Sequence, residues 1–228
     1  MQVFIYLILF AIGWIAGLLV NTTVLYFSEE ERKRKVFFSY IGRFYKGGCH
    51  WLIELFHGAL WVFIVYWCAT QEISFMTSLI YCLLFSALAA ISLIDFRTYE
   101  IPLPLNALIG LLGIFHLLIN RQNWSSYVIG FFSVSLFLYL LYQVTNGAAI
   151  GGGDVKLMAC TGLILGWRLN ILAFFLGCIF ASVIHLIRMK ITKEGHMLAM
   201  GPYLALGILT ALLFGNEMIH WYIAQCLV

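Results

Sequence analysis

Long apolar stretches, separated by short polar breaks, make up most of this chain. An α-helix needs roughly 20 apolar residues to cross about 30 Å of hydrocarbon, so 228 residues leave room for about seven or eight such helices with short connections. The predicted spans cover Val3–Val20, Trp51–Thr70, Ile73–Ile94, Leu103–Ile119, Trp124–Val144, Asp154 to about Trp167–Arg168, Leu169–Ile187 and Met197–Phe214. The pattern therefore predicts an all-α, polytopic membrane bundle.

The composition agrees with a protein that lies mostly within the membrane. Hydrophobic residues make up 63% of the chain and charged residues only 10%, with a mean hydropathy of +0.98. Soluble domains carry about 25% charged residues. Because the spans leave no space for a large soluble domain, we predict one membrane-embedded domain over residues 1–228, with a short basic cytoplasmic segment at about 22–50. The first apolar stretch lacks a preceding basic region and a small-residue cleavage site, so we expect it to be a retained span.

The positions of lysine and arginine indicate the direction of the chain. If the N-terminus lies outside, the cytoplasmic connections hold eleven of the thirteen basic residues, and the outer side holds only Arg121 and Arg168. Cytoplasmic loops carry such an excess, so the bias supports both the span count and the orientation. The basic segment includes Glu29–Lys35, which we interpret first as a solvated surface touching anionic lipid. Binding of a substrate or partner is the alternative interpretation.

Asp95 and Asp154 are the only aspartates, and both fall at span ends that face the cytoplasm in this topology. A carboxylate at membrane depth is costly and indicates a functional site. Two carboxylates brought close together share a proton. The ionised member can then activate a water molecule, while the protonated member polarises a peptide carbonyl. Such a pair can hydrolyse a peptide bond without a metal, and the scattered cysteines, which form no C-x-x-C pair, predict no metal site.

Residues around these carboxylates allow two interpretations each. Gly151–Gly153 could let a substrate backbone approach and could adopt positive φ, or could form a flexible loop before a capping Asp154. Lys156 could bind lipid phosphate or tune Asp154. Glu54 and His57 lie one helical turn apart on the second span. They could form an interfacial pair that balances nearby basic residues, or they could bind a substrate amine.

The local motifs resemble those of the bacterial type IV prepilin peptidases, membrane aspartyl proteases of the GxGD class. In that family an aspartate is followed six or seven residues later by Ile-Pro or Leu-Pro, and a G-x-G-D-x-K-L motif follows downstream. Asp95 with Ile101-Pro102, and the residues Gly151–Leu157, match this pattern. Three further segments are similar to family motifs in the same order: Gly17–Asn21, Trp51–Phe56 and Met200–Gly207.

This resemblance implies an endopeptidase that cleaves the leader from prepilins or pseudopilins at the cytoplasmic face of the bacterial inner membrane. The cut would fall after a glycine, just before the apolar helix of the substrate. Asp95 and Asp154 would be the catalytic dyad. Supporting or substrate-binding roles would fall to Gly151, Gly153, Lys156, Glu54 and Pro102. The implied partners are prepilin substrates and membrane lipid, with no nucleic acid.

The sequence departs from the family between the first two spans. Many members carry two C-x-x-C pairs in a cytoplasmic insert there, and many also N-methylate the new N-terminus with S-adenosylmethionine. Here the insert is reduced to about Thr22–His50, with Cys49 as its single cysteine. We therefore expect no metal there and no cofactor for proteolysis. S-adenosylmethionine would be needed only if the protein also transfers methyl groups.

Two other functions compete with this interpretation. An ion- or proton-coupled transporter could use Asp95, Glu54 and Asp154 as a relay. Transporters usually place such groups near mid-membrane within paired repeats, whereas these lie at span ends and no repeat is evident. A presenilin-like intramembrane protease would share the G-x-G-D motif, but the Ile101–Pro102 context and Met200–Gly207 argue against it.

Overall fold

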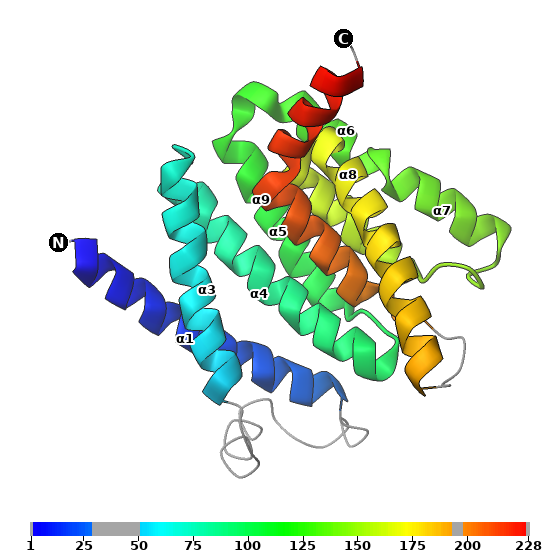
Figure 1. The fold of residues 1–228 in the computed structure, drawn as a ribbon, viewed down its shortest axis with the longest axis horizontal. Helices are drawn as coiled ribbons and strands as arrows, with labels where there is room; N and C mark the ends of the chain where they lie inside the picture. Colours follow the sequence, from blue (N-terminus) through cyan, green and yellow to red (C-terminus); the bar gives the residue numbers. More distant parts are fainter. Residues whose placement is uncertain (1, 29–50, 193–197, 227–228) are drawn as a thin grey trace. The chain divides into compact units, whose positions relative to one another are not determined.

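The computed structural model describes residues 2–28, 51–192 and 198–226 (Figure 1). Over these residues every regular element is a helix. The elements are α1 (Gln2–Ser28), α3 (Trp51–Thr70), α4 (Phe75–Thr98), α5 (Leu103–Ile119), η1 (Arg121–Asn123), α6 (Trp124–Ser133), α7 (Ser135–Val144), α8 (Gly152–Thr192) and α9 (Gly201–Cys226). Six helical stretches within the described part of the chain are long and apolar enough to cross a membrane, and α5 is a shorter apolar helix. The predicted all-α, multi-span fold is therefore confirmed.

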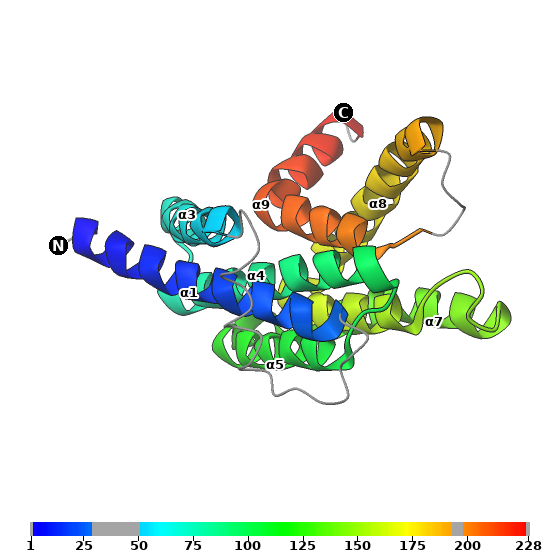
Figure 2. The same cartoon turned by 90° about the horizontal axis from the view of Figure 1, so that it is seen from below.

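The backbone divides into two compact units, residues 1–98 and 99–228. In the first unit, α1 runs across α3 and α4 in both views (Figures 1 and 2). Glycines allow the approach, because a Cβ on Gly13 would lie 2.9 Å from the Trp61 Cβ atom. The Trp61 indole N–H donates to the Ser86 hydroxyl oxygen at 3.1 Å and so joins α3 to α4. The prediction of a single domain over 1–228 stays a prediction.

In the second unit, α8 lies at the centre and contacts α5, α6, α7 and α9. The crossing of α6 and α8 is tight, because a Cβ on Gly130 or on Gly162 would collide with the backbone carbonyl of the other glycine. Asn170 of α8 is fully buried at this crossing. Its Nδ2 atom donates a hydrogen bond to the Gly130 oxygen of α6 at 3.0 Å, which links the two helices. Polar side chains at this depth are stabilised by such bonds, because the hydrocarbon offers no alternative partner.

The chain reverses direction inside α8, at Gly166. This glycine has φ 74° and ψ 170°, a conformation that no helix uses and that glycine adopts without a steric penalty. Residues twelve apart in a continuous helix would be about 18 Å apart, yet the Asn170 Nδ2 atom is 3.1 Å from the Met158 oxygen. α8 is therefore two helices joined by a turn. The turn agrees with the predicted boundary between the sixth and seventh spans at Trp167–Arg168.

Several helices extend beyond the predicted spans. α1 continues past Val20 to Ser28. The reason is local: the Thr22 and Thr23 hydroxyls donate to the carbonyls of Leu18 and Leu19 at 2.7 Å, so these polar residues remain within the helix. α9 likewise continues to Cys226, and the tail from Asn216 belongs to this helix over its described residues. Of the predicted cytoplasmic segment, residues 22–28 belong to α1, and 29–50 lie outside the described residues.

Candidate catalytic site

Asp154 lies in the first turn of α8, directly after the three glycines. The Gly151 carbonyl accepts a hydrogen bond from the Asp154 backbone N–H at 3.1 Å, which begins the helix. The Asp154 side chain is half-buried, whereas that of Lys156, two residues later, is exposed. The structure thus keeps the carboxylate at the helix start, where the helix dipole favours negative charge.

Gly153 brings the Ile101–Pro102 motif against the Asp154 turn. A Cβ on Gly153 would lie 2.9 Å from the Ile101 Cβ atom, so only glycine permits this contact. The buried Asn106 side chain adds a hydrogen bond to the Gly153 oxygen at 3.2 Å, and Pro102 directly precedes α5. Two motifs that are about 50 residues apart in the sequence therefore form one corner of the second unit.

This corner changes the interpretation of the glycines. The space beside Gly153 is filled by Ile101, so this glycine makes room for the protein's own chain. Within the described residues of this loop, the positive-φ residues are Asn146 (φ 50°) and Gly147 (φ 78°), before the three glycines. Gly151 remains exposed, and a Cβ there would lie 3.2 Å from an oxygen of Asp154. Gly151 is therefore the glycine next to the carboxylate that leaves a substrate room to approach.

The segment before α9 reaches the same corner. Met200 begins the helix, because its carbonyl accepts hydrogen bonds from the backbone N–H groups of Tyr203 at 3.2 Å and Leu204 at 3.0 Å. The second part of α8 packs closely on α9, since a Cβ on Gly177 would lie 3.0 Å from the Leu204 Cδ2 atom. Both views show these two helices side by side (Figures 1 and 2). This packing fixes Met200 and Leu204 close to the start of α8.

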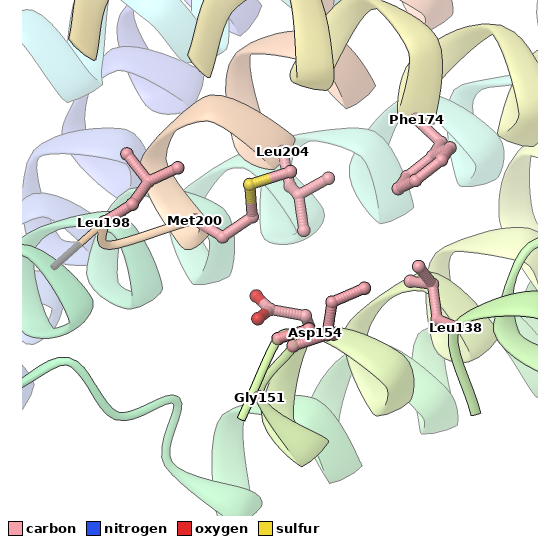
Figure 3. Close-up of a pocket in the computed structure, with 9 residues that line it drawn as sticks. Leu138, Gly151, Asp154, Phe174, Leu198, Met200 and Leu204 are labelled. Atoms are coloured by element: carbon pink, nitrogen blue, oxygen red, sulfur yellow. The ribbon is translucent and has the colours of Figure 1, made fainter. Parts of the chain in front are cut away.

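A cavity of about 180 Å³ borders Asp154 between these segments. Figure 3 shows the carboxylate pointing into the space on the side of Met200 and Leu198. The large apolar side chains of the lining are Leu138, Ile150, Phe174, Leu198, Met200 and Leu204. A carboxylate in such a place can take a proton from a water molecule while the apolar lining holds part of a substrate.

Asp95 belongs to the last turn of α4, in the first unit, and is 5% exposed. Tyr99 has φ 56°, a left-handed conformation of the kind that ends helices, and α4 stops just before it. Ile101 lies six positions after Asp95 along the chain. The pairing of Asp95 with Asp154 stays a prediction.

The other candidate carboxylate, Glu54, lies within the contact between α1 and α3. Glu54 and His57 are each 3% exposed. A Cβ on Gly17 would lie 2.9 Å from the Glu54 Cα atom and 3.0 Å from the His57 Cβ atom. The pair is therefore enclosed between α1 and α3, and its two interpretations, an interfacial pair and a substrate-amine site, both stay predictions. Asn21, the last residue of the Gly17–Asn21 motif, is buried one turn after Gly17 on α1.

No group of three or more His, Cys, Asp or Glu side chains in the described ranges could hold a metal ion. The sequence reasoning also missed Asn106, Asn170 and Phe174. An asparagine inside an apolar span is a usable signal, because a buried amide needs hydrogen-bond partners. Phe174 offers no such signal, since it is one of many apolar residues in its span.

Comparison with known proteins shows what part of the chain is similar to. Residues 82–186 match the type IV leader peptidase family, and this stretch includes Asp95, Pro102 and Asp154. The matched stretch begins within α4 and ends in the second part of α8. The three further motifs, at Gly17–Asn21, Trp51–Phe56 and Met200–Gly207, lie outside it.

Several curated proteins that are similar to this chain have the name prepilin leader peptidase/N-methyltransferase. The protein from Legionella pneumophila is 32% identical over 154 residues, which are 62% of this chain and 53% of that protein. The protein from Aeromonas hydrophila is 32% identical over 148 residues (61% and 51%), and that from Bacillus subtilis strain 168 is 30% identical over 110 residues (46% and 43%). The chain spans about half the length of these curated relatives. No solved structure matches the chain.

Proposed function

We propose that this protein is an aspartyl endopeptidase that removes the leader peptide of type IV prepilins or pseudopilins. The observation that carries the proposal is the position of Asp154. It lies in the stretch that matches the type IV leader peptidase family, at the start of α8, and its carboxylate points into an apolar cavity (Figure 3).

In the proposed reaction, Asp154 acts as general base and Asp95 as general acid. Asp154 takes a proton from water as the water oxygen attacks the peptide carbonyl carbon. Protonated Asp95 donates a hydrogen bond to the carbonyl oxygen and stabilises its developing charge. The proton held on Asp154 then passes to the leaving amide nitrogen, and the C–N bond breaks. The helix dipole at the start of α8 suits Asp154 for the charged role.

Chain length supports the pairing of the two aspartates. An extended chain of six residues, the separation of Asp95 from Ile101, spans at most about 20 Å. Ile101 packs against Gly153, the residue before Asp154. A short tether therefore connects the Asp95 turn to the corner that holds Asp154.

We further propose that the reaction takes place at the cytoplasmic face of the bacterial inner membrane. Ile101, Gly151–Asp154 and Met200 come together at one end of the second unit. The loops that contain these residues are cytoplasmic in the orientation given by the eleven-to-two distribution of basic residues. The expected partners are prepilin substrates and the surrounding lipid.

Methyl transfer is not part of the proposed activity. The curated relatives have N-methyltransferase in their names. In this chain, however, the region between the first two spans is short and has a single cysteine, Cys49. If the protein does methylate its product, it would need S-adenosylmethionine as a co-substrate.

The test is co-expression with a prepilin, with leader removal followed by size and the product N-terminus by mass. The wild-type protein should cleave, and Asp95→Asn and Asp154→Asn should each abolish cleavage. Glu217→Gln is the matched control, because this acidic side chain is exposed and far along α9. Normal processing by either aspartate variant would overturn the dyad. A mass increase of one methyl group on the product would show methyl transfer.

A further inference from the structure

The peptide unit that precedes the Asp154 Cα atom is held at both of its ends. Its carbonyl, that of Gly153, accepts a hydrogen bond from the Asn106 Nδ2 atom at 3.2 Å. Its N–H, that of Asp154, donates to the Gly151 oxygen at 3.1 Å. Because a peptide unit is planar, two hydrogen bonds at its opposite ends fix its orientation. The direction in which the Asp154 side chain leaves the backbone follows from that orientation.

This turn needs a restraint from outside. Three consecutive glycines, Gly151–Gly153, precede the aspartate. Glycine has the greatest conformational freedom of all residues, and the first turn of a helix lacks some of the hydrogen bonds that stabilise a helix interior. The hydrogen bond between Asp154 and Gly151 lies within the turn itself and does not attach it to another element. A contact from elsewhere in the second unit must therefore keep the carboxylate in one place.

Asn106 supplies such a contact from the start of α5. Its backbone N–H donates to the Pro102 oxygen at 3.4 Å, so the residue belongs to a hydrogen-bonded helical turn. Its side chain is 2% exposed, so water does not readily replace its bond to the Gly153 carbonyl. Ile101 packs against the same glycine. Gly153 is thus held by a hydrogen bond and by a steric contact, both from the segment around the start of α5.

The second polar atom of the Asn106 amide shows that packing alone does not account for this side chain. Its Oδ1 atom is buried and has no hydrogen-bond partner among the described residues. A buried acceptor without a partner is costly, and an apolar side chain of similar size, such as leucine, would avoid that cost. The amide therefore destabilises the fold at one atom while its Nδ2 atom donates to the Gly153 carbonyl.

We propose that Asn106 is a positioning residue, which keeps the Asp154 carboxylate in its reactive place by holding the Gly153 carbonyl. The inference rests on the proposed endopeptidase function. Asn106 is not part of the lining of the cavity beside Asp154, so its effect falls on the chemical step and not on substrate binding. A general base must lie within hydrogen-bond reach of its water, and a misplacement of about 1 Å costs roughly 10²-fold in rate.

The first test is Asn106→Leu, assayed for prepilin cleavage with kcat and KM measured separately. We expect kcat to fall about 10²-fold and KM to stay near the wild-type value. Asn170→Leu is the matched control, because Asn170 is also a buried amide that donates to backbone carbonyls, at 3.0 and 3.1 Å. This control should lower the unfolding midpoint but keep kcat per folded molecule. A loss of kcat that the control does not share therefore reports position and not stability.

A second variant supplies the restraint in another way. Gly152→Ala lowers the freedom of the glycine run, and its Cβ atom would lie 3.7 Å from the Tyr142 Cε2 atom, an ordinary contact. The loss of kcat caused by Asn106→Leu should therefore be smaller in the Gly152→Ala protein than in the wild type, since the two changes act on the same turn. An equal loss in both backgrounds would contradict the positioning role.

Hydrogen exchange measures the restraint itself and needs no substrate. Backbone amides of residues 152–155 should exchange faster in Asn106→Leu than in the wild type or in Asn170→Leu, because local opening becomes easier. Unchanged exchange would contradict the restraint. An unchanged kcat in Asn106→Leu, with the wild type cleaving normally, would overturn the positioning role alone. If the wild type cleaves no prepilin, the proposed function falls, and the role of Asn106 in cleavage falls with it.

Discussion

The two units of the molecule enclose carboxylates in different ways. In the first unit, Gly17 lets α1 approach α3 directly over Glu54, and that side chain is 3% exposed between the helices. In the second unit, Gly153 lets Ile101 approach the start of α8, and Asp154 stays half-buried at the edge of a cavity. Both units use a glycine to bring backbone segments together. Only the second of these two contacts leaves its carboxylate bordering the cavity described above, which is what a general base needs.

The largest expected difference comes from removing each carboxylate. Asp154→Ala should lower kcat/KM by about 10³-fold or more, in the range of a lost general base, with little change in thermal stability because the side chain is half-exposed. Glu54→Ala should retain most of the cleavage rate but destabilise the protein by about 1–3 kcal/mol, because it leaves space in a buried contact. Purified variants are compared by cleavage rate and by midpoint of thermal unfolding. A larger loss of activity in Glu54→Ala than in Asp154→Ala would reverse the comparison.

The next effect separates the two glycines. Gly153→Ala places a Cβ against Ile101, so the start of α8 must shift together with Asp154. A misplacement of about 1 Å costs roughly 10²-fold in rate. Gly17→Ala places its Cβ against the Glu54 backbone, and we expect it to lower the unfolding midpoint more than the rate per folded molecule. Ile101→Gly, combined with Gly153→Ala, should restore part of the activity. If the double variant is no better than Gly153→Ala, the steric account of this corner is wrong.

A smaller effect on stability is expected where α8 reverses. Asn170→Leu removes the amide that donates to the Gly130 and Met158 carbonyls. Loss of one partner of a buried hydrogen bond costs about 1–3 kcal/mol. The unfolding midpoint should fall, while the rate per folded molecule stays near the wild-type value because neither Asn170 nor its two acceptors line the cavity beside Asp154. Thermal unfolding with a parallel cleavage assay checks this, and an unchanged midpoint would contradict it.

The smallest effect is expected at Lys156. Its side chain is exposed although it lies two residues after Asp154. Lys156→Gln should change the cleavage rate only slightly, because solvent screens the charge of an exposed lysine. Rates measured at low and high salt should differ little between this variant and the wild type. If Lys156→Gln lowers the cleavage rate strongly, and if high salt lowers the wild-type rate in the same way, then Lys156 does tune Asp154.

Much of this arrangement could be predicted from the sequence. Apolar stretches predicted the helices, and Trp167–Arg168 marked the reversal in α8, because polar residues interrupt a span where the chain leaves the hydrocarbon. The extension of α1 past Val20 was missed, since Thr22 and Thr23 are polar but satisfy their hydroxyls within the helix. Residues that line the cavity could not be predicted either. Leu138 and Phe174 look like any other apolar residue in a span, and only the packing of four segments brings them together.

The role of Gly153 shows the same limit. The glycines before Asp154 predicted room for a substrate backbone, and this stays a prediction, because the sequence did not indicate which segment lies beside each glycine. For Gly153 it is Ile101, from a motif about 50 residues earlier. Sequence motifs thus indicated which segments matter, whereas their mutual contacts depended on the fold.

The central claim is that Asp95 and Asp154 act as one acid–base pair. The most direct measurement is the kcat/KM of prepilin cleavage by Asp95→Asn, Asp154→Asn and the double variant, each purified in the same lipid. Groups that act as a unit show strongly non-additive losses. The account predicts that each single variant loses about 10³-fold or more and that the double variant loses no more than either. A single variant near the wild-type rate, or a double variant that loses the product of the two single losses, would contradict it.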